Sequence, residues 1–200
     1  MVMTPLAMAA LALLSERPMH PYEMYQTLIQ RREDRLVKVR PGSLYHTVNK
    51  LTELGLVRVT GTDREGNRPE RTTYEITEQG QLALAERIAD IIAAPVYEYP
   101  SFPVAIGEAH NLPRETVIDL VRRRLKGLDV LRDESEEAFA HFGRTSLPRK
   151  YWLDVSYLEA IYTAERTWLS RLLADLESGE LDWGEEKRSD PAQTSKKKDD

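Results

Sequence analysis

The chain has 200 residues, of which 41% are hydrophobic and 30% are charged, and its length argues against one large enzyme barrel. The absence of cysteine excludes disulfides, thiolate zinc sites and cysteine nucleophiles. The net charge of -5 argues against a wholly basic coat for nucleic acid, although it leaves room for local basic patches.

The first part of the chain predicts three helices. Thr4 followed by Pro5 is typical of a helix N-terminus, and apolar residues then recur at helical spacing. A proline-containing break separates the first helix from the second, and Pro41 begins the third. Gly55 stands where a left-handed cap would end that helix. The predicted helices span 5–15, 21–32 and 41–54.

Two short β-rich segments follow, at 56–60 and 72–76, joined by a polar loop over 61–71. Thr77 can cap a further helix that continues to Pro95. Three helices followed by a two-stranded hairpin is the order of a winged helix-turn-helix, in which the hairpin is the wing.

The second half of the chain predicts long helices behind a proline-rich linker. Apolar residues at helical spacing predict helices over 113–142 and 150–177. We therefore predict a mainly α fold with a small β-hairpin, in which an N-terminal winged helix-turn-helix precedes a C-terminal dimerisation domain of long helices. The predicted parts are a winged-helix domain (1–94), a linker or arm (95–112), a helical domain (113–180) and a disordered tail (181–200).

The predicted third helix has one buried face and one polar face. Its apolar stripe consists of Leu44, Val48, Leu51 and Leu54. Its hydrogen-bonding side chains are Ser43, Tyr45, His46, Asn49 and Lys50. These five are either a solvated face or the face that a recognition helix presents to the major groove of DNA.

The predicted wing is rich in arginine, at Arg58, Arg64, Arg68 and Arg71. Residues 31–71 hold ten Lys and Arg against six Asp and Glu, a local charge of +4. A protruding basic loop suits a phosphate backbone or a minor groove, and the alternative is an ordinary charged surface loop.

Two motifs resemble the PadR family of winged-helix transcriptional regulators. Residues 40–57 are similar to the family's recognition-helix signature, and residues 68–80 to its wing-return motif. The resemblance covers about residues 4–90. It implies a homodimer that binds a palindromic site in promoter DNA and usually represses, with the dimer made by the helices after the wing.

The DNA-binding hypothesis gives each polar residue a role. Major-groove contacts are assigned to Tyr45, His46, Asn49 and Lys50, phosphate contacts to Arg40 and Ser43, and flanking backbone or minor-groove contacts to Arg64, Arg68 and Arg71. The alternative is a winged-helix adaptor that binds proteins and no DNA.

The predicted C-terminal helices carry apolar stripes too large to remain exposed to solvent, so they must pack against other apolar surface. Their aromatic residues either anchor a core or subunit contact or line a pocket for a small-molecule effector. The candidate pocket residues are Tyr151, Trp152, Tyr157, Tyr162 and Trp168.

Other function classes find no support in the sequence. It has no nucleophile elbow, P-loop or dinucleotide-binding glycine pattern, so we expect no enzyme activity. The four histidines are widely spaced, and we expect neither a metal nor a cofactor. The longest apolar run, 6–14, is shorter than the roughly 20 residues of a membrane span. We expect a cytoplasmic protein without membrane contact.

Overall fold

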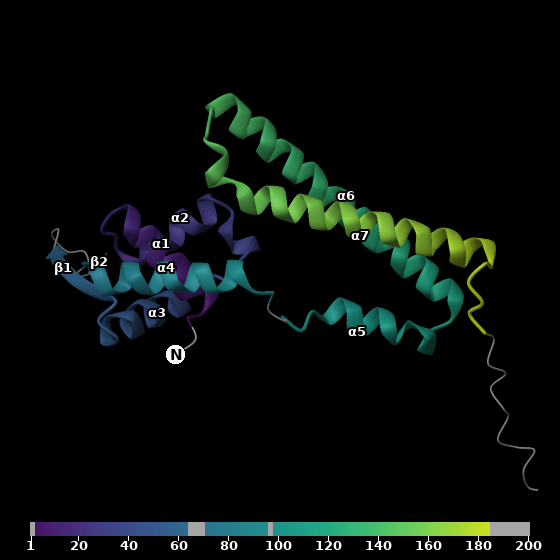
Figure 1. Cartoon of the computed structure of the whole chain (residues 1–200), viewed down its shortest axis with the longest axis horizontal. Helices are drawn as coiled ribbons and strands as arrows, with labels where there is room; N and C mark the ends of the chain where they lie inside the picture. Colours follow the sequence, from purple (N-terminus) through teal and green to yellow (C-terminus); the bar gives the residue numbers. More distant parts are fainter. Residues whose placement is uncertain (1–2, 64–70, 96–97, 185–200) are drawn as a thin grey trace, which may run out of the picture. The chain divides into compact units, whose positions relative to one another are not determined.

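The computed structural model describes residues 3–63, 71–95 and 98–184 (Figure 1). The chain forms two compact units, Met1–Glu98 and Tyr99–Asp200. The first contains three helices, a two-stranded antiparallel sheet and a fourth helix, and the second is helical. The mainly α fold class with a small hairpin is confirmed.

The helices of the first unit begin where their prolines and capping threonines predict. They are α1 (Pro5–Glu16), α2 (Pro21–Gln30), α3 (Pro41–Glu53) and α4 (Glu78–Ala93), with a short 3₁₀ turn at Glu33–Arg35. The Thr4 hydroxyl accepts from the Ala7 amide, and the Thr77 hydroxyl accepts from the Gly80 amide. These bonds satisfy amides that the first turn of a helix leaves without a backbone partner.

The wing pairs β1 (Val57–Asp63) with β2 (Arg71–Ile76), with an irregularity between Val59 and Gly61. The strands extend into the segment predicted as loop. Strand propensity missed these residues because they are polar, whereas the pairing is made by backbone amides and carbonyls that every residue carries. Met19, in the turn between α1 and α2, exchanges two 3.0 Å backbone bonds with Tyr74 of β2. The turn is thereby fixed to the wing.

The core of the first unit lies among α1, α2 and α3 and extends to the base of the wing and α4. It includes the fully buried Leu11, Met24, Leu28, Leu44 and Val48.

Leu54 does not join that core as expected. The helix α3 ends at Glu53, and Leu54 is its C-cap residue with 40% of its surface exposed. Gly55 has φ +71°, and the Leu56 amide bonds to the Leu51 carbonyl. The left-handed glycine therefore turns the chain before the expected stripe is complete.

An ion pair joins the ends of the first two helices. Arg31 donates to both carboxylate oxygens of Glu16, at 2.5 and 2.7 Å. The hydrogen bond from Arg31 lowers the pKa of Glu16 below its usual value, and the charges of Arg31 and Arg17 act in the same direction. Because the pKa is lowered in the folded state, the pair stabilises the fold above the ordinary carboxyl pKa, and this stability is lost as pH falls through the lowered value.

Replacing Arg31 with methionine should therefore cost more stability at pH 7 than at about pH 3. We expect a loss of at most about 1 kcal/mol, because both side chains are 46% exposed and solvent screens the pair. Urea unfolding at the two pH values measures it. Arg123→Met is the control, because Arg123 is exposed and forms no ion pair within the described residues. An equal loss at both pH values would show that the alkyl stem, not the charge, is responsible.

The second unit contains α5 (Ser101–Gly107), α6 (Arg114–Thr145) and α7 (Leu153–Ser178), with 3₁₀ turns at Ala109–Asn111 and Arg149–Tyr151. The helix α5 lies in the segment predicted to be a linker. Its proline, Pro103, lies in the first turn, where a missing amide costs no helical bond. Phe102 and Ile106 pack against the core of the unit, which is the contact that orders the helix.

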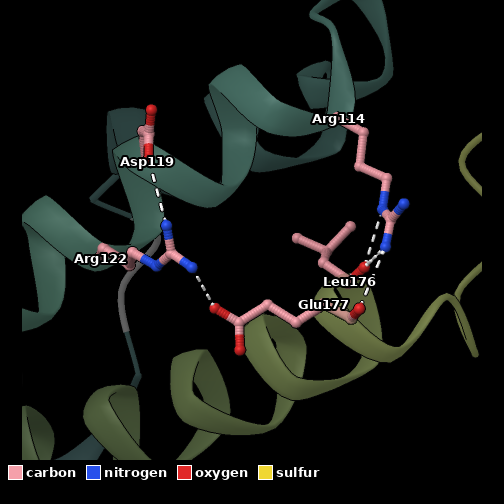
Figure 2. Close-up of polar contacts among 5 residues, drawn as sticks. All are labelled: Arg114, Asp119, Arg122, Leu176 and Glu177. Atoms are coloured by element: carbon pink, nitrogen blue, oxygen red, sulfur yellow. Dashed lines mark hydrogen bonds and ion pairs between the residues drawn. The ribbon is translucent and has the colours of Figure 1, made fainter.

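The helices α6 and α7 form an antiparallel hairpin around the fully buried Leu169 and Leu176. Polar contacts lock the end where α6 begins and α7 finishes (Figure 2). Arg114 donates to the carbonyls of Leu176 and Glu177, and Arg122 bonds to the carboxylates of Asp119 and Glu177. Arg114 thus supplies a positive charge and donors to carbonyls that the end of α7 leaves unpaired.

The predicted disordered tail begins at 181, but residues 181–184 make contacts within the second unit. Trp183 is half-buried and its indole nitrogen donates to the Leu112 carbonyl at 2.9 Å. The Leu181 amide also donates to Asp175. A polar composition predicted disorder here, but one aromatic side chain with a hydrogen-bond partner holds the segment. The rest of the predicted tail, 185–200, lies outside the described residues.

Candidate nucleic-acid interface

The helix α3 has the two faces that the sequence predicts near its centre. Leu44, Val48 and Leu51 are buried and fix the helix against the core. The opposite face is exposed and polar, and it consists of Ser43, Tyr45, His46, Asn49 and Lys50. The structure thus brings together five of the nine residues predicted to bind DNA. Their side chains supply hydrogen-bond donors and acceptors, the groups that base edges and phosphates can bind.

The N-terminus of α3 has no side-chain cap, unlike those of α1, α2 and α4. Its first intrahelical bond runs from the Leu44 amide to the Arg40 carbonyl, which leaves the amides of Gly42 and Ser43 pointing out of the helix. Arg40 is exposed beside them and forms no ion pair with a described residue. The geometry suits a phosphate oxygen, because unpaired amides and the helix dipole both attract an anion.

Only some of the predicted wing residues lie within the described part of the chain. Arg64 and Arg68 lie outside the described residues, and Arg71 begins β2, opposite Asp63 in the register of the hairpin. Arg58 bonds to Glu75, its direct cross-strand neighbour, at 2.5 Å. The local charge of +4 therefore overstates the cationic surface, since Arg58 and Arg31 both pair with acids outside the 31–71 window.

One residue beside this face was missed from the sequence. His20 is the N-cap of α2, and its ring meets Tyr45 of α3 edge-on, with ring centroids 5.9 Å apart and planes at 77°. Its position directly before Pro21 was a signal for an N-cap. Nothing local in the sequence indicates the contact with Tyr45.

The five aromatic residues predicted for an effector pocket do not converge within the second unit. Trp152 packs against Phe139 and Phe142, and Tyr162 contributes to the hairpin core. Tyr151 and Tyr157 are largely exposed. Trp168 alone lines a hollow of about 300 Å³, together with Phe102, Pro103, Ile106, Ala164 and Glu165.

The helix α7 carries an outward apolar stripe. Tyr157, Ile161 and Trp168 are between 44% and 66% exposed, and their spacing of four and seven residues places them on one side of the helix. Ala164 continues the same line and is also exposed. The buried Leu169 and Leu176 face α6 instead. The stripe is therefore a second apolar surface of α7, which the hairpin itself does not use.

The described residues give no sign of two other kinds of site. They contain no cluster of three or more His, Asp or Glu side chains arranged to hold a metal ion. None of the helices among them is long and apolar enough to span a membrane.

Comparison with known families identifies the N-terminal unit. The family model described as the transcriptional regulator PadR-like family matches residues 10–86. This range runs from α1 through α3 and the wing into α4. The chain carries a PadR-like domain. The resemblance seen in the two sequence motifs is confirmed, and the family is one of transcriptional regulators. Among curated protein sequences, none matches significantly.

Known structures extend the likeness beyond the PadR-like domain. Bacillus subtilis PadR in complex with operator DNA matches with a TM-score of 0.72 and 18% identity, over 86% of this chain and 99% of that one. The same protein in complex with p-coumaric acid matches with a TM-score of 0.71 and 17% identity, over 86% and 98%. The PadR-like regulator BC1756 from Bacillus cereus gives 0.62 and 16%, over 87% and 99%. At these identities the likeness shows the fold.

Proposed function

We propose that this protein is a sequence-specific DNA-binding repressor that acts as a homodimer on a palindromic promoter site. The observation that carries the proposal is the exposed polar face of α3 beside its uncapped N-terminus, within a PadR-like domain. Tyr45, His46, Asn49 and Lys50 contact the major groove, and Arg40 and Ser43 hold phosphates. The arginines of the wing, Arg64, Arg68 and Arg71, hold the flanking backbone or minor groove.

The homodimer is supported by the outward stripe of α7. Large apolar side chains at regular helical spacing are costly to leave in water, and a second copy of the stripe is a complementary cover for them. A two-fold dimer places two copies of α3 against two half-sites, which requires an inverted repeat with half-sites one turn of DNA apart.

We also propose that a small apolar effector relieves repression. The hollow beside Trp168 supports this part of the proposal, because its lining is almost entirely aromatic and aliphatic. The B. subtilis relative has been crystallised with p-coumaric acid, which supplies a precedent for a small aromatic ligand on this fold.

Selection of duplexes from a random DNA library by the full-length protein tests the proposed function. We expect enrichment of an inverted repeat whose half-site centres are about ten base pairs apart or a multiple of that. If no duplex is enriched above the input library, the protein is not a sequence-specific DNA-binding protein, and the adaptor alternative gains support.

Variants of α3 should separate base contacts from phosphate contacts. Asn49→Ala should weaken binding to the selected duplex by about 1–3 kcal/mol per half-site and leave binding to random DNA unchanged. Arg40→Ala should weaken both and reduce the salt slope by about 1 per half-site. Fluorescence anisotropy at several salt concentrations measures both effects.

The matched control for Arg40→Ala is Arg123→Ala, which removes another exposed arginine, from α6. If the two arginine variants lower the salt slope equally, the phosphate contact is not at the start of α3.

A further inference from the structure

His20 lies between the start of α2, the proposed DNA-binding helix α3 and the turn that is bonded to the wing. It is the N-cap of α2, its ring contacts Tyr45 of α3, and the residue before it, Met19, is bonded through its backbone to Tyr74 of the wing. Met19 is 1% exposed and Pro21 is buried. The backbone on both sides of His20 is therefore anchored, so the direction of its side chain is set by the fold.

The imidazole ring of His20 makes two separate contacts. Nδ1 accepts a hydrogen bond from the Tyr22 amide at 3.0 Å, which restricts the rotation of the ring about the Cβ–Cγ bond. The ring then meets Tyr45 edge-on, a geometry that aromatic pairs favour. The hydrogen bond from the Tyr22 amide orients the imidazole. The oriented imidazole in turn restricts where the Tyr45 ring can lie.

Tyr45 needs such a restraint. It is 41% exposed and lies on the polar face of α3, outside the buried residues of the core, so the core does not fix the position of its ring. An aromatic side chain that is already ordered before binding loses less conformational entropy when it contacts DNA. A partner that holds it in place therefore increases affinity without itself contacting a base.

We propose that His20 is a positioning residue of the DNA-binding surface, which holds Tyr45 in place for the groove while its Nδ1 caps α2. The inference rests on the proposed DNA-binding function. It assigns a role in operator affinity to the turn between α1 and α2, outside the helix that contacts the bases.

A pair of reciprocal variants tests the proposal. His20→Asn retains a side chain that caps helices well but removes the ring, whereas His20→Phe retains a ring and removes the cap acceptor. We expect His20→Asn to keep the thermal midpoint of the wild type and to lose between about two- and tenfold in affinity per half-site, the range of an aromatic pair. His20→Phe should lower the midpoint and, at a temperature where it is folded, keep more of the affinity than His20→Asn, because a ring remains beside Tyr45 although no cap bond orients it.

The second measurement is a double-mutant cycle with Tyr45→Ala on the selected duplex. In that background His20→Asn should cost no further affinity, because the residue it positions is gone. Unchanged affinity of His20→Asn in the wild-type background, or additive losses in the cycle, would overturn the inference. The cycle decides the matter even if His20→Phe does not fold. Failure of the wild-type protein to bind any duplex would instead refute the proposed function.

Discussion

Replacing Gly80 with alanine should destabilise the N-terminal unit by about 3 kcal/mol, the upper part of the usual range for overpacking. Gly80 is buried in the first turn of α4, which packs on the turn between α3 and β1. A Cβ atom at this position would overlap the carbonyl oxygen of Leu56 and lie 2.8 Å from Cγ1 of Ile76. The Leu56 carbonyl also accepts the Thr77 amide, so it cannot move without losing that bond. The clash outweighs the gain of about 1 kcal/mol that alanine usually brings to a helix.

The measurement must separate the two units, and the tryptophans make this possible. All three, Trp152, Trp168 and Trp183, belong to the second unit, so their fluorescence reports on that unit. Hydrogen exchange of peptides from 3–63 reports on the first. Gly80→Ala should accelerate exchange there and leave the tryptophan transition in place.

The control for Gly80 is Gly42→Ala, which also changes a glycine in the first turn of a helix of the same unit. A Cβ atom on Gly42 would have nothing within 4 Å. Gly42→Ala should therefore leave the stability of the N-terminal unit unchanged or raise it slightly. Equal stability of the two variants would show that α4 can shift away from Leu56 at little cost.

The contact between α4 and the turn before β1 shows which parts of the fold could be predicted from the sequence. Thr77 and Gly55 act through their own backbone neighbourhood, a cap and a left-handed turn, and both were predicted correctly. The need for glycine at position 80 depends on a carbonyl that lies 24 positions earlier in the chain, which no local pattern encodes.

The same distinction applies to the elements that were missed. The helix α5 contains a proline and is short, so its local propensity is poor, and the packing of Phe102 and Ile106 against distant residues decides its conformation. Charge counting likewise found the basic window but not its ion pairs, because Glu16 and Glu75 lie outside it.

The candidate DNA-binding face was largely predictable because a single helix period sorts buried from exposed residues on α3. For the aromatic residues of α7, the helix period did not predict which are buried and which are exposed. Tyr162 lies on the inward side, whereas Tyr157 and Trp168 lie on the outward side. A helix that buries one apolar face and exposes another gives no clear periodicity, and only the position of α6 distinguishes the two.

Charge on the outward stripe of α7 should abolish both the proposed dimer and tight DNA binding. We expect Tyr157→Glu combined with Ile161→Glu to yield a folded monomer, because both side chains are exposed in the isolated hairpin and become costly to bury only against a second copy. Loss of the dimer removes the gain from engaging two half-sites at once. Affinity for the selected duplex should then fall by about 10²- to 10⁴-fold.

Sedimentation equilibrium and anisotropy measure the two losses. Ser170→Glu combined with Ala174→Glu adds the same charge to exposed positions on another side of α7 and should remain a dimer with wild-type affinity. A wild-type protein that is monomeric, or a stripe variant that stays dimeric, would refute the assignment of this surface. A monomeric stripe variant that binds the duplex as tightly as the wild type would show that one α3 helix is sufficient, and the palindromic site would no longer be required.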